Sequence, residues 1–304
     1  MQMKYSFDKD LTKQEIYATG PELAETMWKD RDEDWNKVYY YPHSQEQLVA
    51  TLDNPVLMTD NEKIAQLNDY IAKETIRLLQ QKPMRIVEYD WIRMEFEQWK
   101  YYWVWSPNID TLLFCRAIKD ENFDGVKSMI EVGSGPWFIA KYVWSKWKDI
   151  QEIVMSDINE NAKKYFDDTN TDERAKFVLW DAKKYLEDKN FDLIVCNPPY
   201  IPRPHAIEDN AYEWLELLIY LIKNFDKELI INVSNLADDI INPVLESSWA
   251  KIEQLDEMEV PLKVGNVLNN KERLDFLVKE KGLKELDKDW HKYWQGLRIL
   301  KLTK

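Results

Sequence analysis

A regular alternation of apolar, strand-like runs with helical segments in the middle of the chain constrains its fold most strongly. The strand-like runs are "VKSMIEVG", "EIVMSD", "AKFVLWD", "FDLIVC" and "ELIINVS", between residues 126 and 234, and helical segments separate them. Alternating strands and helices with short links imply a parallel sheet that is covered on both faces. The pattern therefore predicts an α/β fold around a mostly parallel sheet.

The flanking segments add elements to this core. A helix is predicted over "NIDTLLFCRAI", directly after Pro107, and two extended strands before it, "MRIVEYDWIRMEF" and "QWKYYWVWS". In the tail, "EMEVPLKV" and "YWQGLRILKL" are predicted strands on either side of a helix, "NNKERLDFLVKEKG". We therefore expect these two tail strands to join the end of the parallel sheet.

Residues 1–82 have a different pattern, which is acidic and mostly helical. Its clearest segment is "TDNEKIAQLNDYIAKETIRLLQ", in which Thr59 is a candidate N-cap with Glu62 three residues later. Apolar residues then follow helical spacing as far as Leu78. We therefore predict two domains: an N-terminal helical region over residues 1–82 and an α/β domain over residues 83–304.

The composition narrows the class of protein and its surroundings. The 304 residues are 45% hydrophobic and 32% charged, which is typical of a soluble globular protein. The two cysteines, Cys115 and Cys196, form neither a disulfide framework nor a zinc-ligand spacing, and with three scattered histidines no metal site is expected. There is no apolar run of 18 residues and no signal-peptide pattern, so we expect a cytoplasmic protein without membrane contact.

The net charge of −14 bears on the partner. Binding to duplex nucleic acid depends on neutralising phosphates with Lys and Arg, so this charge disfavours a broad nucleic-acid interface. A protein partner is expected instead.

A glycine turn follows the first of the predicted parallel strands. Gly133 and Gly135 stand between that strand and a helix, where a backbone must approach a ligand closely. The dinucleotide fingerprint would need Gly or Ala at position 138, where this chain has Phe138, and no Walker A sequence follows. The turn therefore favours neither NAD nor ATP, and an ordinary strand-to-helix turn is the alternative.

Two of the next strands end in a carboxylate. Asp157 lies about 20 residues after the glycine turn, where an acid can accept both hydroxyl protons of a ribose; the alternative is an N-cap for the helix that starts at Asn159. Asp181 could receive an exocyclic amine such as adenine N6, and its alternative is likewise a helix cap.

The strand "FDLIVC" ends abruptly at Asn197-Pro198-Pro199-Tyr200. Two prolines cannot continue a sheet, because neither donates an N–H. This composition suits methylation of a planar nitrogen, whose delocalised lone pair makes it a poor nucleophile. The Asn197 side chain and the Pro198 carbonyl would accept its two N–H groups, Pro199 would hold Pro198 extended, and Tyr200 would stack on the planar group. A purely structural turn is the alternative.

The order of these features resembles class I S-adenosylmethionine-dependent methyltransferases with an NPPY motif. Within that group the chain most resembles the HemK/PrmC-type glutamine-N5 methyltransferases, through Pro107 with Asp110-Thr111 and through "NPPYIP". The resemblance covers residues 84–304 and implies a Rossmann-like fold of seven strands with helices on both faces. It implies that S-adenosylmethionine is bound by Glu131, Gly133, Gly135, Asp157, Asp181 and Asn197. It also implies that Asn197, Pro198, Pro199 and Tyr200 hold the target nitrogen.

The cofactor turn departs from the family in one residue, since Trp137 replaces its usual third glycine. Its ring must point away from the cofactor or replace one of its contacts. Three hypotheses follow: an enzyme that methylates a glutamine amide of a protein, an N6-adenine methyltransferase acting on RNA or DNA, and a non-catalytic module in which Trp137 blocks the cofactor.

Overall fold

The computed structural model describes two compact units of the chain. Its described residues are 84–90, 92–97, 100–101, 104–105, 107, 109–202, 215–262, 265–268, 270–288 and 291–304, with six short strands before residue 59. One unit comprises Met1–Tyr102 with Asp287–Trp290, and the other Trp103–Leu286 with His291–Lys304. Our predicted boundary lay between residues 82 and 83, whereas the units divide after Tyr102.

In the first unit the described residues form two antiparallel sheets. One has the order β6-β5-β1-β7-β8 and the other β2-β4-β3. The bounds of these strands are β1 Gln2–Ser6, β2 Glu15–Ile16, β3 Trp28–Arg31, β4 Lys37–Tyr40, β5 Leu48–Thr51, β6 Leu57–Met58, β7 Met84–Tyr89 and β8 Ile92–Glu97. Residues 1–82 were predicted to be mostly helical, and the strands β1 to β6 were not predicted. The helix predicted over residues 59–80 lies outside the described residues and stays a prediction.

Two strand predictions before residue 107 need correction. "MRIVEYDWIRMEF" is a hairpin of β7 and β8, in which Tyr89 pairs with Ile92 across a turn at Asp90. Asp90 has a φ of 51°, a left-handed conformation that Asp adopts more readily than most residues. In "QWKYYWVWS" the described residues are not in a strand; Tyr101 is buried and Trp105 is exposed.

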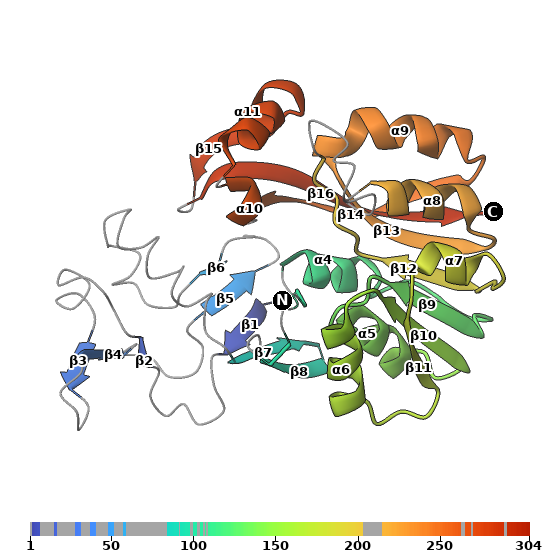
Figure 1. The fold of residues 1–304 in the computed structure, drawn as a ribbon, viewed down its shortest axis with the longest axis horizontal. Coiled ribbons are helices and arrows are strands. Elements are labelled where there is room, and N and C mark those ends of the chain that lie inside the picture. Colours follow the sequence, from blue (N-terminus) through green and yellow to red (C-terminus); the bar gives the residue numbers. More distant parts are fainter. Residues whose placement is uncertain are drawn as a thin grey trace. The chain divides into compact units, whose positions relative to one another are not determined.

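The second unit contains the predicted α/β core (Figure 1). Its elements are α4 Ile109–Ala117, β9 Ser128–Val132, α5 Phe138–Lys146, β10 Glu152–Asp157, α6 Glu160–Thr169, β11 Ala175–Leu179, α7 Ala182–Leu186, β12 Leu193–Cys196, α8 Glu216–Asn224, β13 Glu228–Ser234, α9 Asp238–Ser247, β14 Lys251–Pro261, α10 Gly265–Leu268, α11 Lys271–Glu280, β15 Lys284–Lys288 and β16 His291–Thr303. A short 3₁₀ turn, Asn235–Ala237, joins β13 to α9.

The sheet of this unit has the order β11-β10-β9-β12-β13-β16-β14, and β15 pairs with β16. β9 to β13 run parallel, whereas β16 is antiparallel to both β13 and β14. The predicted Rossmann-like, mostly parallel sheet is confirmed. Neither α9 nor β15 was predicted from the sequence.

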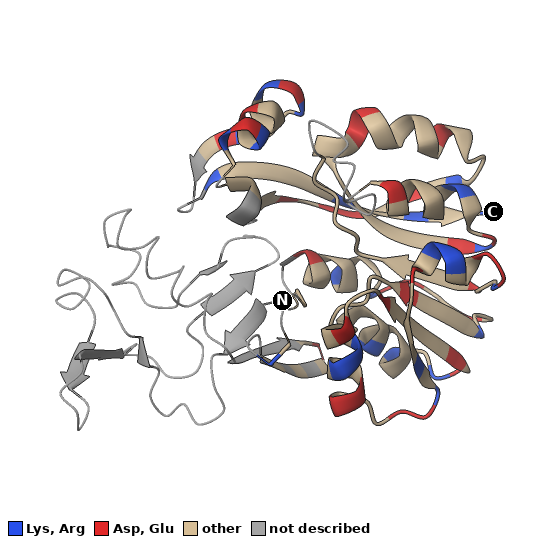
Figure 2. Cartoon of the chain, viewed as in Figure 1, with Lys and Arg blue, Asp and Glu red and all other residues tan. Residues whose placement is uncertain are grey.

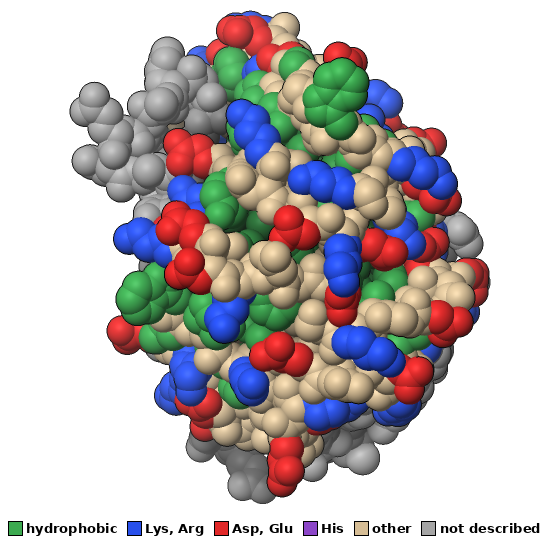
Figure 3. All heavy atoms as spheres, turned by 90° about the vertical axis from the view of Figure 1, so that its right-hand side faces the viewer, with side chains coloured by type: hydrophobic (Ala, Val, Ile, Leu, Met, Phe, Trp, Pro, Cys, Tyr) green, Lys and Arg blue, Asp and Glu red, His purple; other side chains and the backbone are tan. Residues whose placement is uncertain are grey.

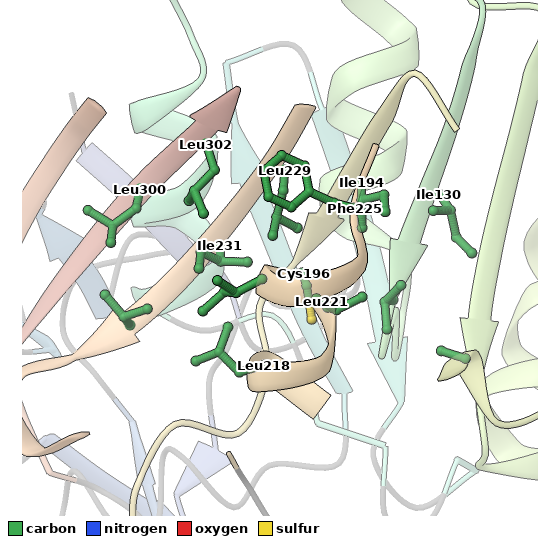
Figure 4. Close-up of a cluster of buried hydrophobic side chains, with 14 of the residues drawn as sticks. Ile130, Ile194, Cys196, Leu218, Leu221, Phe225, Leu229, Ile231, Leu300 and Leu302 are labelled. Carbon is green, nitrogen blue, oxygen red and sulfur yellow. The ribbon is translucent and has the colours of Figure 1, made fainter. Parts of the chain in front are cut away.

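An apolar cluster fixes the helices to one side of this sheet. Figure 4 shows Leu218 and Leu221 of α8, and Phe225 directly after it, next to Ile194 of β12 and Leu229 and Ile231 of β13. All of these side chains are at least 95% buried. Each buried side chain of this size contributes about 1.5–3 kcal/mol relative to an exposed one, so this cluster holds β12 and β13, which carry part of the site, in place. Within the part of the chain that the structure describes, no helix is long and apolar enough to cross a membrane.

Trp137 lies just before α5 and points into the core. Its φ of 49° is in the left-handed region, and its side chain is only 2% exposed. The indole stacks on Trp144 of α5, with ring centroids 5.2 Å apart, and meets the edge of Phe166 of α6 at 5.9 Å. The Trp137 ring was expected either to point away from the cofactor turn or to replace a cofactor contact. It packs between α5 and α6 and therefore points away from the turn.

A pair of tryptophans allows a matched test of this packing. Trp249 has a φ of 58°, similar to the 49° of Trp137, but its side chain is 94% exposed. The two tryptophans therefore share a left-handed φ and differ in burial. Trp137→Ala should lower the free energy of unfolding by about 3 to 5 kcal/mol, because it leaves a cavity in a buried site. Trp249→Ala should change it by less than about 0.5 kcal/mol. Urea denaturation measures both, and equal effects would contradict a packing role for the Trp137 indole.

Candidate active site

The four strand ends selected from the sequence meet at one edge of the sheet. Val132, the last residue of β9, pairs with Ser156 of β10 and with Cys196 of β12. Asp157, at the end of β10, pairs with Leu179 of β11. The residues that follow these strands therefore leave the sheet at one level. The edge lies at a switch point of the chain, where β9 is flanked by β10 and β12, and ligands of open α/β sheets bind at such points.

The glycine turn is fixed by its neighbouring strand. The N–H groups of Gly133 and Ser134 both donate to the carbonyl of Ser156, at 2.8 and 3.1 Å. Gly133 and Gly135 have φ values of 65° and 48°, which cost glycine little and other residues more. The Ser134 hydroxyl is buried and has no hydrogen-bond partner among the described residues. The turn thus offers a polar group to whatever binds there.

Asp157 closes the turn from the adjacent strand. Its Oδ2 accepts from the Gly135 N–H and its Oδ1 from the Asn159 N–H, both at 2.9 Å. Asn159, rather than Asp157, is the N-cap of α6, so the capping alternative for Asp157 is wrong. Burial raises the pKa of Asp157, and the hydrogen bonds from the backbone oppose that rise. The Ile158 N–H also contributes to this opposition, and of the carboxylate's roughly four acceptor positions at least one remains for a bound hydroxyl.

Asp181 does act as a helix cap. It is the N-cap of α7, and its Oδ1 accepts from the Lys183 N–H at 3.0 Å. The capping alternative is confirmed here. It does not exclude a contact with a ligand, because a carboxylate has about four acceptor positions.

Two exposed apolar residues stand beside these acids, and the sequence analysis missed them. Ile158 follows Asp157 and is 64% exposed; Trp180 precedes Asp181 and is 59% exposed. Large apolar side chains that remain exposed at a candidate site offer apolar surface to a flat ligand ring. Their position next to two strand-end acids was the available signal in the sequence.

Glu131 lies inside the sheet, one residue before the end of β9. It is 3% exposed, and its Oε2 accepts from the Ala140 N–H of α5 at 2.7 Å. Burial raises the pKa of Glu131 from an ordinary value of 4.5 to about 8, and the negative charge of Asp157 adds to the rise. The carboxyl group is therefore protonated at neutral pH in the free protein.

The buried Glu131 should make stability depend on pH. Between pH 4.5 and about 8 the folded protein keeps a proton that the unfolded chain has released. Stability should therefore fall as the pH rises through this window, with a maximum slope of about 1.4 kcal/mol per pH unit for one group. Glu131→Gln removes this group and should flatten the dependence. Chemical denaturation at several pH values measures the slope, and an unchanged slope in Glu131→Gln would refute the assignment.

The Asn197–Tyr200 motif is held by residues from two other elements. Asn197 Nδ2 donates to Oδ2 of Asp110, in the first turn of α4, at 3.1 Å, and the Tyr200 hydroxyl donates to the same oxygen at 3.4 Å. Asn197 Oδ1 accepts from Nδ2 of Asn232, on β13, at 2.8 Å. Burial, with the negative charge of Asp110, holds the pKa of Tyr200 well above its usual range. Pro198 is buried and Pro199 is exposed.

The chain after Tyr200 is anchored by the tail of the protein. The buried Arg273 of α11 donates through Nη2 to the carbonyl of Ile201 at 3.0 Å. Ile201 lies in a buried cluster with Val267, Leu277 and Leu283 from the segment between β14 and β16. No pattern in the sequence indicated this anchoring role. The next residues, 203–214, lie outside the described residues.

These residues fit S-adenosylmethionine, the cofactor implied by the sequence. The glycine turn presents a Ser134 hydroxyl that has no partner among the described residues, and Asp157 keeps an acceptor position for a ribose hydroxyl. Ile158 and Trp180 offer apolar surface beside Asp181. The Trp137 indole packs between α5 and α6 and therefore does not occupy the turn.

Comparison with known proteins agrees with this site. The family model of the methyltransferase small domain matches residues 108–215, about a third of the chain. That segment contains the glycine turn, Asp157, Asp181 and the Asn197–Tyr200 motif. No curated protein sequence matches the chain.

Several solved structures are similar to parts of the chain. Precorrin-6y C5,15-methyltransferase from Geobacter metallireducens is 9% identical, with a TM-score of 0.41 over 66% of this chain and 92% of its own. Ribosomal protein L11 methylase from Lactobacillus delbrueckii is 15% identical, with a TM-score of 0.39 over 64% and 79%. The N-methyltransferase NodS from Bradyrhizobium japonicum, solved with S-adenosylhomocysteine, is 10% identical, with a TM-score of 0.37 over 64% and 85%.

The strand order, the site at the carboxyl edge and the matched methyltransferase small domain together support an S-adenosylmethionine-dependent methyltransferase.

Proposed function

We propose that this methyltransferase transfers the methyl group to a planar nitrogen, and that its substrate is a glutamine amide in another protein. The observation that carries the proposal is the Asn197–Tyr200 motif at the end of β12, next to the glycine turn after β9. A polar amide, two prolines and an aromatic ring at this place suit an amide substrate. This is also the substrate of the HemK/PrmC-type enzymes that the sequence resembles.

The chemistry required of these residues is orientation. An amide nitrogen has a delocalised lone pair, so two acceptors must hold its two N–H groups and turn the lone pair toward the methyl group. Asn197 Oδ1 uses one lone pair for Asn232 and keeps one for the substrate. The Pro198 carbonyl is the second acceptor in this proposal. When bound, S-adenosylmethionine supplies the electrophilic methyl group, and alignment of the nitrogen contributes most of the rate.

Tyr200 and Asp110 complete the substrate side of the proposed site. The Asp110 carboxylate ties the Tyr200 hydroxyl and the Asn197 amide to one oxygen, which restricts both side chains. The Tyr200 ring would then offer a fixed flat face to the planar amide. The raised pKa of Tyr200 keeps this ring uncharged at neutral pH.

An exocyclic amine of adenine is the second candidate substrate, because the same residues can hold it. Nucleic-acid binding depends on neutralising phosphates, and the net charge of −14 argues against it. Lys and Arg are interspersed with Asp and Glu over the helices in Figure 2 and over the face shown in Figure 3. This distribution supports a protein rather than a nucleic acid as substrate.

A non-catalytic module, the third hypothesis from the sequence, required Trp137 to block the cofactor. Its indole stacks on Trp144 instead, which supports the catalytic hypotheses. We also propose a cytoplasmic location, where the two buried thiols of Cys115 and Cys196 would stay reduced.

Labelled methyl groups distinguish the two substrates. The protein is incubated with S-adenosylmethionine labelled in its methyl group and with separated protein, RNA and DNA fractions of the source cells. We expect label in the protein fraction, and mass spectrometry should locate it as a methylated glutamine side chain. Label confined to RNA or DNA would replace the proposal by the adenine alternative.

Two substitutions should separate catalysis from cofactor binding. Asn197→Ala should lower turnover by about 100-fold or more, because it removes an acceptor that aligns the nitrogen. Its affinity for S-adenosylmethionine in calorimetric titration should stay within about twofold of the wild type. Asp157→Ala should instead weaken that affinity, by about tenfold or more, because it removes hydrogen bonds to a carboxylate.

Matched controls are available for both substitutions. Asn224→Ala and Asp188→Ala change the same residue types at exposed positions away from the site and should alter neither property. Full turnover of Asn197→Ala on the true substrate would refute the role of the motif.

A further inference from the structure

Asn232 is a polar residue in the buried, largely apolar middle of β13. Its neighbours in β13 are Leu229, Ile230, Ile231 and Val233, and all five side chains are fully buried. Because Ile231 pairs with Cys196, the next residue of β13 lies beside Asn197 where β12 ends. The Asn232 amide uses this position, since its Nδ2 donates to Asn197 Oδ1 at 2.8 Å.

Only the NH₂ end of the Asn232 side-chain amide has a hydrogen-bond partner among the described residues. Its Oδ1 is buried and accepts no hydrogen bond from the described residues. A buried acceptor without a partner destabilises the folded state, because it loses water and gains nothing in return. A leucine of similar size would avoid that cost and extend the apolar cluster around Ile231. Stability therefore does not account for an asparagine at this position.

The bond from Asn232 fixes which way the Asn197 amide faces. Asn197 Nδ2 donates to the Asp110 carboxylate, and its Oδ1 accepts from Asn232. Turning the amide by 180° would set its nitrogen against the nitrogen of Asn232 and its oxygen against the carboxylate. Both contacts would be repulsive, so the two neighbours select one orientation between them. Asp110 holds one end, and Asn232 holds the oxygen.

We propose that Asn232 is a positioning residue of this methyltransferase. It orients the Asn197 carboxamide so that Oδ1 keeps a lone pair at a fixed place for an N–H of the substrate. The inference rests on the proposed function of the Asn197–Tyr200 motif. It extends that function to a buried residue which does not itself touch the substrate.

Two substitutions remove the donor in different ways. Asn232→Leu replaces the amide by an apolar side chain, and Asn232→Asp replaces the donating NH₂ group by an oxygen that opposes Asn197 Oδ1. Both should lower kcat by about tenfold or more, since misalignment of a reacting group is costly. The affinity for S-adenosylmethionine should stay within about twofold. Asn232→Leu should retain or increase the stability of the wild type in urea denaturation.

Ser234→Ala is the matched control on the same face of the same strand. The Ser234 hydroxyl is buried, donates to Gln295 Oε1 at 2.8 Å and accepts from the Leu236 N–H at 3.1 Å. Its loss should lower stability and leave kcat unchanged, which is the reverse of the pattern for Asn232→Leu. A loss of turnover in Asn232→Leu that only follows a loss of stability would overturn the proposal.

A readout without substrate tests the same orientation directly. In ¹⁵N-labelled protein the side-chain amide signal of Asn197 is identified by its absence in Asn197→Ala. It should shift or broaden in Asn232→Leu and Asn232→Asp and stay in place in Ser234→Ala. An unchanged signal would overturn the positioning role of Asn232, whatever the substrate is.

Comparison of the variants separates the two ideas. If Asn197→Ala is inactive and Asn232→Leu is fully active, the positioning role falls and the proposed function stands. If Asn197→Ala is fully active, the proposed function falls and the positioning role falls with it.

Discussion

The register of hydrogen bonds between β9, β10 and β12 is the constraint on which the site depends. Val132 pairs with Ser156 on one side and with Cys196 on the other, so three strands end at one level. The glycine turn, Asp157 and Asn197 follow directly from those ends. A slip of one residue in any of the three strands would exchange the faces to which its side chains point and move its functional residue to the other face. The apolar clusters that set the register therefore also set the geometry of the site.

The same sheet edge concentrates polar groups that cost stability. Glu131 is a buried carboxyl group with a raised pKa, the Ser134 hydroxyl lacks a partner among the described residues, and so does Asn232 Oδ1. Away from this edge, β12 and β13 are filled with leucine, isoleucine and valine. Stability alone does not explain why three such groups lie together at the edge where a ligand or substrate is expected.

Much of the fold was predictable because its signals are local. β10 and β13 have the bounds expected from their apolar runs, and α4 begins after Pro107 as its pattern indicates. The hairpin of β7 and β8 was missed because its turn at Asp90 contains no glycine or proline. α9 was missed as well; it contains Pro243, which usually argues against a helix. Isolated residue propensities cannot outweigh tertiary packing in such segments.

The sequence by itself determined the parallel sheet, the order of the strand ends and the identity of the residues that follow them. Periodicity and turn chemistry act over a few residues, so they can be read along the chain. Only the tertiary structure decided what those residues contact. Asp157 closes the glycine turn, the Trp137 indole lies between two helices, and Asp110 and Asn232 meet at Asn197 from positions 87 and 35 residues away. Contacts over such separations arise from the packing of whole elements, and no local pattern encodes them.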